Sequence, residues 1–124
     1  MPQPIVHYEI AANDAKKLEA FYEGLFGWKM KPAPQPNYSM IDGKQGADFG
    51  IDGGIYQIEG QDPAGVRMYA NVDDAEAYLA KVAGLGGTVI VPAFAVPGGA
   101  IKIGIFTDPE GNVAGVVETL AQPA

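Results

Sequence analysis

The sequence predicts an α+β fold in which two βαβββ modules form a curved mixed sheet around a central cavity. Three observations lead to this prediction. Short apolar runs alternate with polar residues as strands do, a capped amphipathic helix follows the first run, and the same order of elements starts again about sixty residues later. The 17 Gly and 10 Pro are spread between these runs, which favours many short strands and turns.

The first module begins with a strand at residues 5–10, where Val6 and Tyr8 alternate with His7 and Glu9. Asn13 and Asp14 are suited to cap a helix, and apolar residues follow at helical spacing until Gly27 ends it. Further strands are expected at residues 28–31, 38–42 and 49–57, separated by proline-rich and Asp-Gly breaks. This half therefore reads β-α-β-β-β.

The second module follows a polar linker at residues 61–65 and repeats the pattern. A strand is expected at 66–72, Asp73 and Asp74 begin a helix, Gly86 and Gly87 end it, and strands follow at 88–91, 100–106 and 112–119. Matching caps occur in any two helices, but here the flanking strands repeat as well. We expect a single domain over residues 1–124, with modules 1–60 and 61–124.

Composition excludes several classes of protein. A net charge of -7 and the lack of a Lys/Arg cluster argue against nucleic acid or an anionic membrane as partner. The N-terminus lacks the basic and apolar regions of a signal peptide, and no apolar run is long enough to span a bilayer, so the expected location is cytoplasmic. The sequence has no cysteine, which excludes disulfides, thiolate nucleophiles and Cys-based metal sites.

Three segments suggest a family. The strand His7-Tyr8-Glu9-Ile10, the helix end at 21–28 (FYEGLFGW) and the stretch at 106–112 (FTDPEGN) followed by Glu118 resemble the vicinal oxygen chelate superfamily. Within it, the chain is most similar to glyoxalase/bleomycin-resistance/dioxygenase-like and lactoylglutathione-lyase-related proteins. The resemblance implies the duplicated fold and a homodimer. It does not fix an activity, because the superfamily includes isomerases, dioxygenases, epimerases, thiol transferases and antibiotic-binding proteins.

The resemblance also implies where a divalent metal sits in the metal-dependent members, whose ligands come from the first and last strands of each module. His7 matches the first position, but the repeat puts Arg67 at its equivalent, and a cation repels a metal. The nearest equivalents on the last strands are Gly54 and Gly115, which have no side chain. We therefore expect no cofactor. If a divalent metal binds, His7 and Glu118 are the candidate ligands, although Glu118 lies on the strand face opposite Gly115.

Alternation assigns five polar residues to the face that lines the predicted cavity: His7, Glu9, Arg67, Tyr69 and Asn71. Arg67 can clamp a carboxylate or phosphate, and His7 with Glu9 can form an acid/base pair. Two alternatives stay open: His7 is a structural histidine, and Glu9 with Arg67 is an internal ion pair. Trp28 and Tyr38 are further candidates for lining the pocket, or are core residues.

These residues predict a protein that binds a small molecule without a metal. The alternative is a glyoxalase-like lyase or isomerase that uses His7 with Glu9 or Glu118, with or without a metal. Both hypotheses place the same histidine at the centre of the site.

Overall fold

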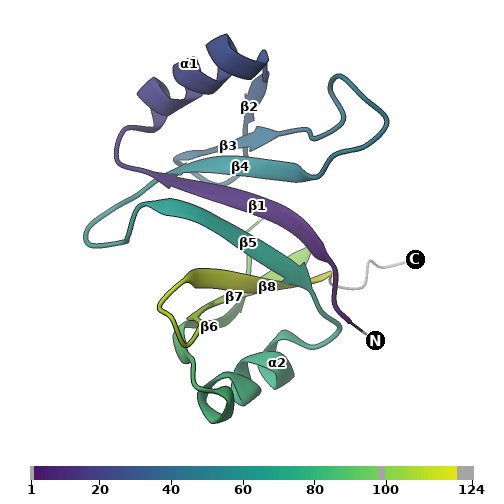
Figure 1. Cartoon of the computed structure of the whole chain (residues 1–124), viewed down its shortest axis with the longest axis vertical. Coiled ribbons are helices and arrows are strands. Elements are labelled where there is room, and N and C mark those ends of the chain that lie inside the picture. The colour runs from purple at the N-terminus through teal and green to yellow at the C-terminus, as the bar shows by residue number, and fades with distance from the viewer. Residues whose placement is uncertain (1, 98–99, 120–124) are drawn as a thin grey trace. The chain divides into compact units, whose positions relative to one another are not determined.

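The computed structural model describes residues 2–97 and 100–119 and has the predicted α+β composition, with a βαβββ order of elements that occurs twice (Figure 1). It divides into two compact units. One is His7–Val66, and the other is Arg67–Ala124 together with Met1–Val6. The boundary thus lies a few residues beyond the predicted one at residue 60, and the N-terminal segment belongs with the second unit, where the Asn71 amide donates to the Pro4 carbonyl at 2.9 Å.

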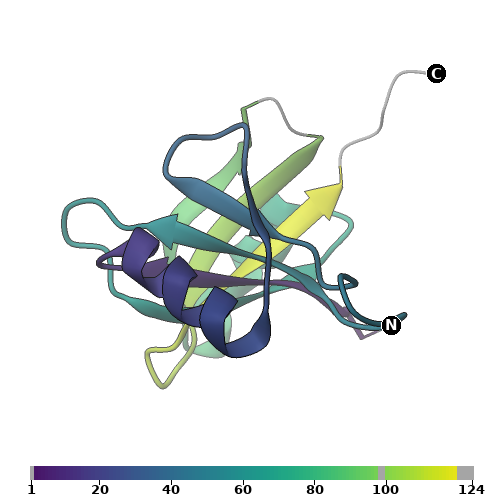
Figure 2. The same ribbon diagram turned by 90° about the horizontal axis from the view of Figure 1, so that it is seen from above.

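The first module contains β1 (Ile5–Ala12), α1 (Ala15–Phe26), β2 (Met30–Pro32), β3 (Tyr38–Ile41) and β4 (Asp52–Gln57). Its strands lie in the order β2-β3-β4-β1. The β4 and β1 strands are parallel, whereas the other two pairs are antiparallel, so the sheet is mixed. Figures 1 and 2 show α1 lying along one side of these strands.

Helix α1 starts and stops at the residues that the sequence indicates. The Asp14 side chain accepts from the Lys17 amide at 3.1 Å, and Gly27, at φ 74°, donates its amide to the Glu23 carbonyl. Beneath the helix lies a core of small and aliphatic residues: Ile10, Ala12, Ala15, Ile41 and Ile55, with Tyr8, Leu18, Tyr22, Trp28 and Met30 packed against it. Even-numbered residues of β1 therefore face the helix, and His7 and Glu9 face away from it, as alternation predicted.

The second module contains β5 (Gly65–Asn71), α2 (Ala75–Val82), the 3-10 turn η1 (Ala83–Leu85), β6 (Thr88–Ala95), β7 (Ile101–Thr107) and β8 (Val113–Thr119). The order β5-β8-β7-β6 and the parallel β5/β8 pair repeat the plan of the first module. Asp74 caps α2 through the Ala77 amide, and the helix side of the sheet has its own core of Val72, Ala75, Leu79 and Val116.

Strand β6 is longer than predicted. It was expected to end at Val91 but continues to Ala95, past Pro92. Its pairing with β7 shifts register between Val91 and Phe94, and within this module β6 has a neighbour on one side. A proline, which cannot donate to a ladder, is tolerated at such an irregular edge position.

Candidate functional site

A histidine of β1 and a tyrosine of β3, the two strands on either side of β4, meet on the side of the first module that faces away from α1. The Nε2 atom of His7, in β1, lies 2.8 Å from the hydroxyl of Tyr38, at the start of β3. Which ring donates depends on the imidazole tautomer. The contact joins the predicted catalytic residue to a predicted pocket residue that is 31 positions away in sequence.

The environment of His7 favours the neutral imidazole. Burial lowers the pKa of His7 below its ordinary value of 6.5, while the charges of Glu9 and Asp52 act in the opposite direction and do not offset the burial. At neutral pH the ring is therefore a hydrogen-bonding group with one acceptor nitrogen rather than a cation. A neutral imidazole is the form that acts as a general base or binds a polar ligand without charge.

Strand pairing brings further polar residues to the same face. In the parallel β1/β4 register, His7 is beside Asp52 and Glu9 is beside Gly54. Glu9 is buried. Tyr56, on the same face of β4, has its pKa raised by burial and then by Asp62, whose carboxylate lies 3.5 Å from the hydroxyl. Sequence reasoning missed Asp52 and Tyr56, although alternation along β4 from Gly54 would have placed both on this face.

The glycines at the expected metal-ligand positions lie directly beneath tyrosine rings. A Cβ atom on Gly54 would overlap the ring of Tyr38, and one on Gly115 would overlap the ring of Tyr69. In the β5/β8 register Gly115 is beside Tyr69, which is only 3% exposed. A carboxylate or imidazole has no room at either position. The residues present therefore do not fit the metal site that the family resemblance implies.

Three of the predicted ligand-binding residues belong to the second unit. Arg67, Tyr69 and Asn71 alternate on β5, on the side away from α2, as predicted. Arg67 and Tyr69 are buried, and the backbone of Asn71 is fixed by its bond to Pro4. Their role in binding stays a prediction.

In this structure Glu118 accepts a hydrogen bond from the first turn of α2. Its Oε1 accepts from the Ala75 amide at 2.8 Å, at the first turn of the helix. The first module repeats this contact with Gln57, whose Oε1 accepts from the Ala15 amide at 2.8 Å. The two residues occupy the same place in the repeated fold, so Glu118 has a capping role that needs no metal.

An acidic cluster surrounds this cap. Among the described residues, Asp74, Glu76 and Glu118 lie close enough for one oxygen of each to share an ion. However, Glu76 is paired with the Lys102 ammonium at 2.8 Å, and Asp74 caps the helix. His7 is not part of this cluster.

Trp28 lies on the helix side of the first module. Its ring stacks on Tyr22 with centroids 5.1 Å apart and packs near Phe26 at 5.2 Å and Tyr8 at 6.2 Å. It also lines a cavity of about 660 Å³ between the end of α1 and the loop at residues 42–51. This location differs from that of the His7–Tyr38 pair, because Tyr8 and His7 point to opposite faces of β1.

The fold defined by these modules recurs in solved structures. A glyoxalase/bleomycin resistance protein/dioxygenase superfamily member from Vibrio splendidus aligns with a TM-score of 0.64 and 17% identity, covering 96% of this chain and 100% of that one. A methylmalonyl-CoA epimerase variant from Streptomyces coelicolor, in complex with 2-nitronate-propionyl-CoA, aligns with a TM-score of 0.65 and 16% identity, covering 100% and 99%. These likenesses concern the fold alone.

Sequence comparison gives the family. Residues 7–117 match the family described as glyoxalase-like domain, and the chain belongs to this family. It is also 31% identical over 118 residues to proteins of Mycobacterium bovis and Mycobacterium tuberculosis, each named "Putative glyoxylase CFP32". The alignment covers 87% of this chain but 42% of those relatives, so the chain spans less than half of their length. The predicted membership in the vicinal oxygen chelate superfamily is confirmed.

The structure gives one finding on membranes. No helix among the described residues is both long enough and apolar enough to cross a bilayer.

Proposed function

We propose that this chain binds a small polar molecule on the helix-free face of its first module, at His7 and Tyr38, without a divalent metal. One observation supports this most. Where the family's metal ligands are expected, this chain has Gly54 and Gly115, and a tyrosine ring covers each of them. The neutral His7 ring and the phenol of Tyr38 are hydrogen-bonded to each other at 2.8 Å, and a polar ligand would exchange this bond for bonds of its own. Such a pair suits a carbonyl, hydroxyl or carboxylate group of a ligand.

The experiment is a metal titration of the intact protein, purified without an affinity tag. We expect Ni, Zn, Mn, Fe and Mg to give no stoichiometric binding and no thermal stabilisation, and His7→Ala to leave this result unchanged. One tightly held metal per chain that His7→Ala removes would overturn the metal-free proposal. Glu118→Gln is the matched control, because glutamine keeps the cap to Ala75 but is a poor metal ligand.

A second candidate is a glyoxalase-like lyase or isomerase that uses His7 and Glu9 as a base and acid pair. The lowered pKa of His7 favours it, because a neutral imidazole can accept a proton at pH 7. The names of its relatives, a glyoxylase and an epimerase of an acyl-CoA ester, indicate proton abstraction beside a carbonyl as the reaction to test. Turnover of a 2-oxoaldehyde thiohemiacetal or an acyl thioester, lost in His7→Ala and retained in Glu118→Gln, would establish it.

Other expectations stay predictions at this level. Arg67 is expected to hold an anionic group of the ligand, and Tyr69 and Asn71 to provide hydrogen bonds. A homodimer is likewise expected from the family resemblance, and a cytoplasmic location from the sequence. Sedimentation of the purified chain tests the first of these two.

A further inference from the structure

We propose a second binding site, independent of the function above, in the cavity between the end of α1 and the loop at residues 42–51. We infer that it takes a small planar aromatic cation. The cavity has a volume of about 660 Å³, within the range of roughly 300–1,000 Å³ that is usual for small-molecule pockets. All its lining residues belong to the first unit.

One wall of the cavity is aromatic. Tyr8, Phe26 and Trp28 line it together, and the Trp28 ring is close to both others, with centroids 6.2 Å from Tyr8 and 5.2 Å from Phe26. At its rim, Phe26 is 58% exposed and Ile51 is 45% exposed. Large apolar side chains left open beside a concave surface favour a flat apolar ligand that covers them.

Another part of the lining comes from the loop at residues 42–51, whose two ends lie very close together. A Cβ atom on Gly43 would overlap the backbone of Ile51, and one on Gly50, at φ 130°, would overlap the Gly43 carbonyl. The Gly43 amide also donates to Asp52 at 2.9 Å. Only glycine allows two backbone segments to approach this closely. The close contact between residues 43 and 50–51 therefore fixes the loop beside the cavity.

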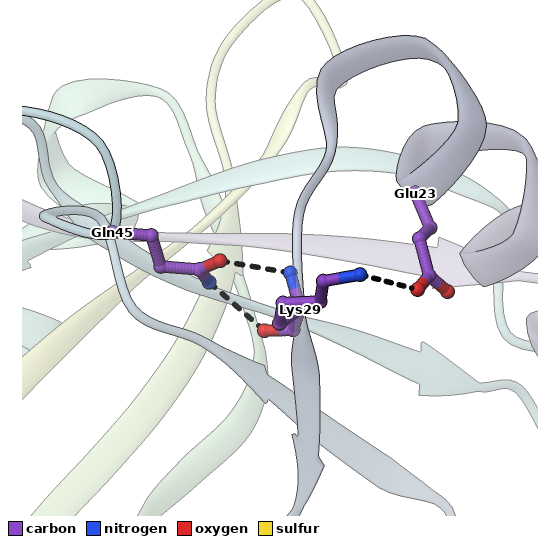
Figure 3. A network of polar contacts seen from close by, with 3 residues as sticks. All are labelled: Glu23, Lys29 and Gln45. Atoms are coloured by element: carbon purple, nitrogen blue, oxygen red, sulfur yellow. Dashed lines mark hydrogen bonds and ion pairs between the residues drawn. The ribbon is translucent and has the colours of Figure 1, made fainter.

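Gln45 attaches the body of this loop to the segment that follows α1. The amide group of Gln45 accepts from the Lys29 amide and donates to the Lys29 carbonyl, each at 2.8 Å (Figure 3). The ammonium of Lys29 points the other way and pairs with Glu23 of α1 at 3.1 Å (Figure 3). These bonds join the loop, the segment after α1 and the helix itself, so the cavity is preformed.

Charge selects the kind of ligand. Lys29 and Asp42 are the charged residues of the lining, and the Lys29 ammonium is already paired with Glu23. Asp42 is thus the charge available to a ligand, although one of its oxygens also accepts from the Lys44 amide at 2.8 Å. Aromatic faces attract cations, and the net charge of -7 acts in the same direction. A positively charged aromatic molecule can therefore pack its ring on the aromatic residues and place its charge near Asp42.

The test compares benzamidine with benzoate, which have the same ring and opposite charges. Trp28 is the only tryptophan of the chain, so its fluorescence and its indole N–H signal report on this cavity. We expect benzamidine to give a saturable change with a Kd of about 1 mM, as a fragment of its size allows, and benzoate to bind about tenfold more weakly. In Asp42→Asn this preference should disappear.

Two glycine variants decide whether the cavity is the binding site. Gly46 lines it and Gly24 does not, and a Cβ atom at either meets nothing within 4 Å. Gly46→Phe should abolish benzamidine binding, and Gly24→Phe should bind it as the wild type does. The proposal is overturned if no change saturates, if Gly46→Phe binds normally, or if benzoate binds as tightly as benzamidine.

Discussion

On the side away from its helix, the first module has ionisable residues around His7, whereas the second has Arg67 and several aliphatic residues around Tyr69. Strand register places Ile103, Ile105 and Val117 beside Gly115 on that face of the second module. On the helix side the modules agree: both have an aspartate cap, a left-handed glycine after the helical segment, and a β-strand side chain that accepts from the first helical amide. The repeated features hold the fold together, and the divergent face is where function is expected.

The largest predicted difference in stability between the modules is at Gly54 and Gly115, the two glycines covered by tyrosine rings. Gly115→Ala places a methyl group against Tyr69, which is 3% exposed, and 2.9 Å from the Gly104 carbonyl, so neither neighbour can easily move. Gly54→Ala meets only the outer part of the Tyr38 ring, which is partly exposed. We expect losses of about 3 kcal/mol and about 1 kcal/mol respectively in the free energy of unfolding, measured with urea.

Equal losses in unfolding free energy at the two glycines would contradict this, because they would show that Tyr69 moves aside as easily as Tyr38. Gly24→Ala is the control, because its added methyl group meets nothing within 4 Å. Alanine has the higher helix propensity, so this exposed helical change should be neutral or slightly stabilising.

The next prediction concerns the shared helix cap. Gln57→Ala and Glu118→Ala each remove the acceptor of a 2.8 Å bond from the first helical amide and should cost about 1 kcal/mol by denaturant unfolding. Glu118→Gln keeps an acceptor and should cost much less. If Glu118→Gln destabilises as much as Glu118→Ala, the charge of Glu118 matters more than the hydrogen bond, and the two modules are not equivalent at this position.

The sequence predicted the repeated features well and the divergent face less well. Caps and glycine stops have local causes, so Asp14, Gly27 and Asp74 were identified correctly. The roles of Gln57 and Glu118 depend on which strand end lies beside which helix, and this was not visible from spacing. Trp28 was interpreted either as a pocket residue or as a core residue, and the structure packs it against the core on the helix side. The contact between His7 and Tyr38 also needed tertiary structure.

His7, the one histidine of the chain, should make the stability of the first module depend on pH near neutrality. The second module has no such group. Because burial lowers the pKa of folded His7 below 6.5, the unfolded chain binds a proton first as the pH falls. The stabilising contribution of the neutral ring is complete above about pH 6.5 and declines as the pH falls from there to the folded pKa. We expect an NMR midpoint below 6.5 for His7, and a difference in unfolding free energy between wild type and His7→Asn that shrinks over this range. A midpoint at or above 6.5 would contradict the assignment of a neutral, buried ring.

The smallest predicted effect compares an exposed ion pair of the first module with one of the second. Lys29 and Glu23 have side chains that are 74% and 51% exposed, whereas Lys102 in its pair with Glu76 is 25% exposed. Water and salt screen the first pair more, so Glu23→Gln should change the melting temperature less than Glu76→Gln. The pKa of Glu76 is lowered chiefly by its hydrogen bond to Lys102, although Asp74 opposes this, so neutralising it should be destabilising. Melting curves at low and high salt test both points. If Glu76→Gln raises the melting temperature, repulsion from Asp74 and Glu118 outweighs the pair, and the acidic cluster of the second module is a strained site rather than a stabilised one.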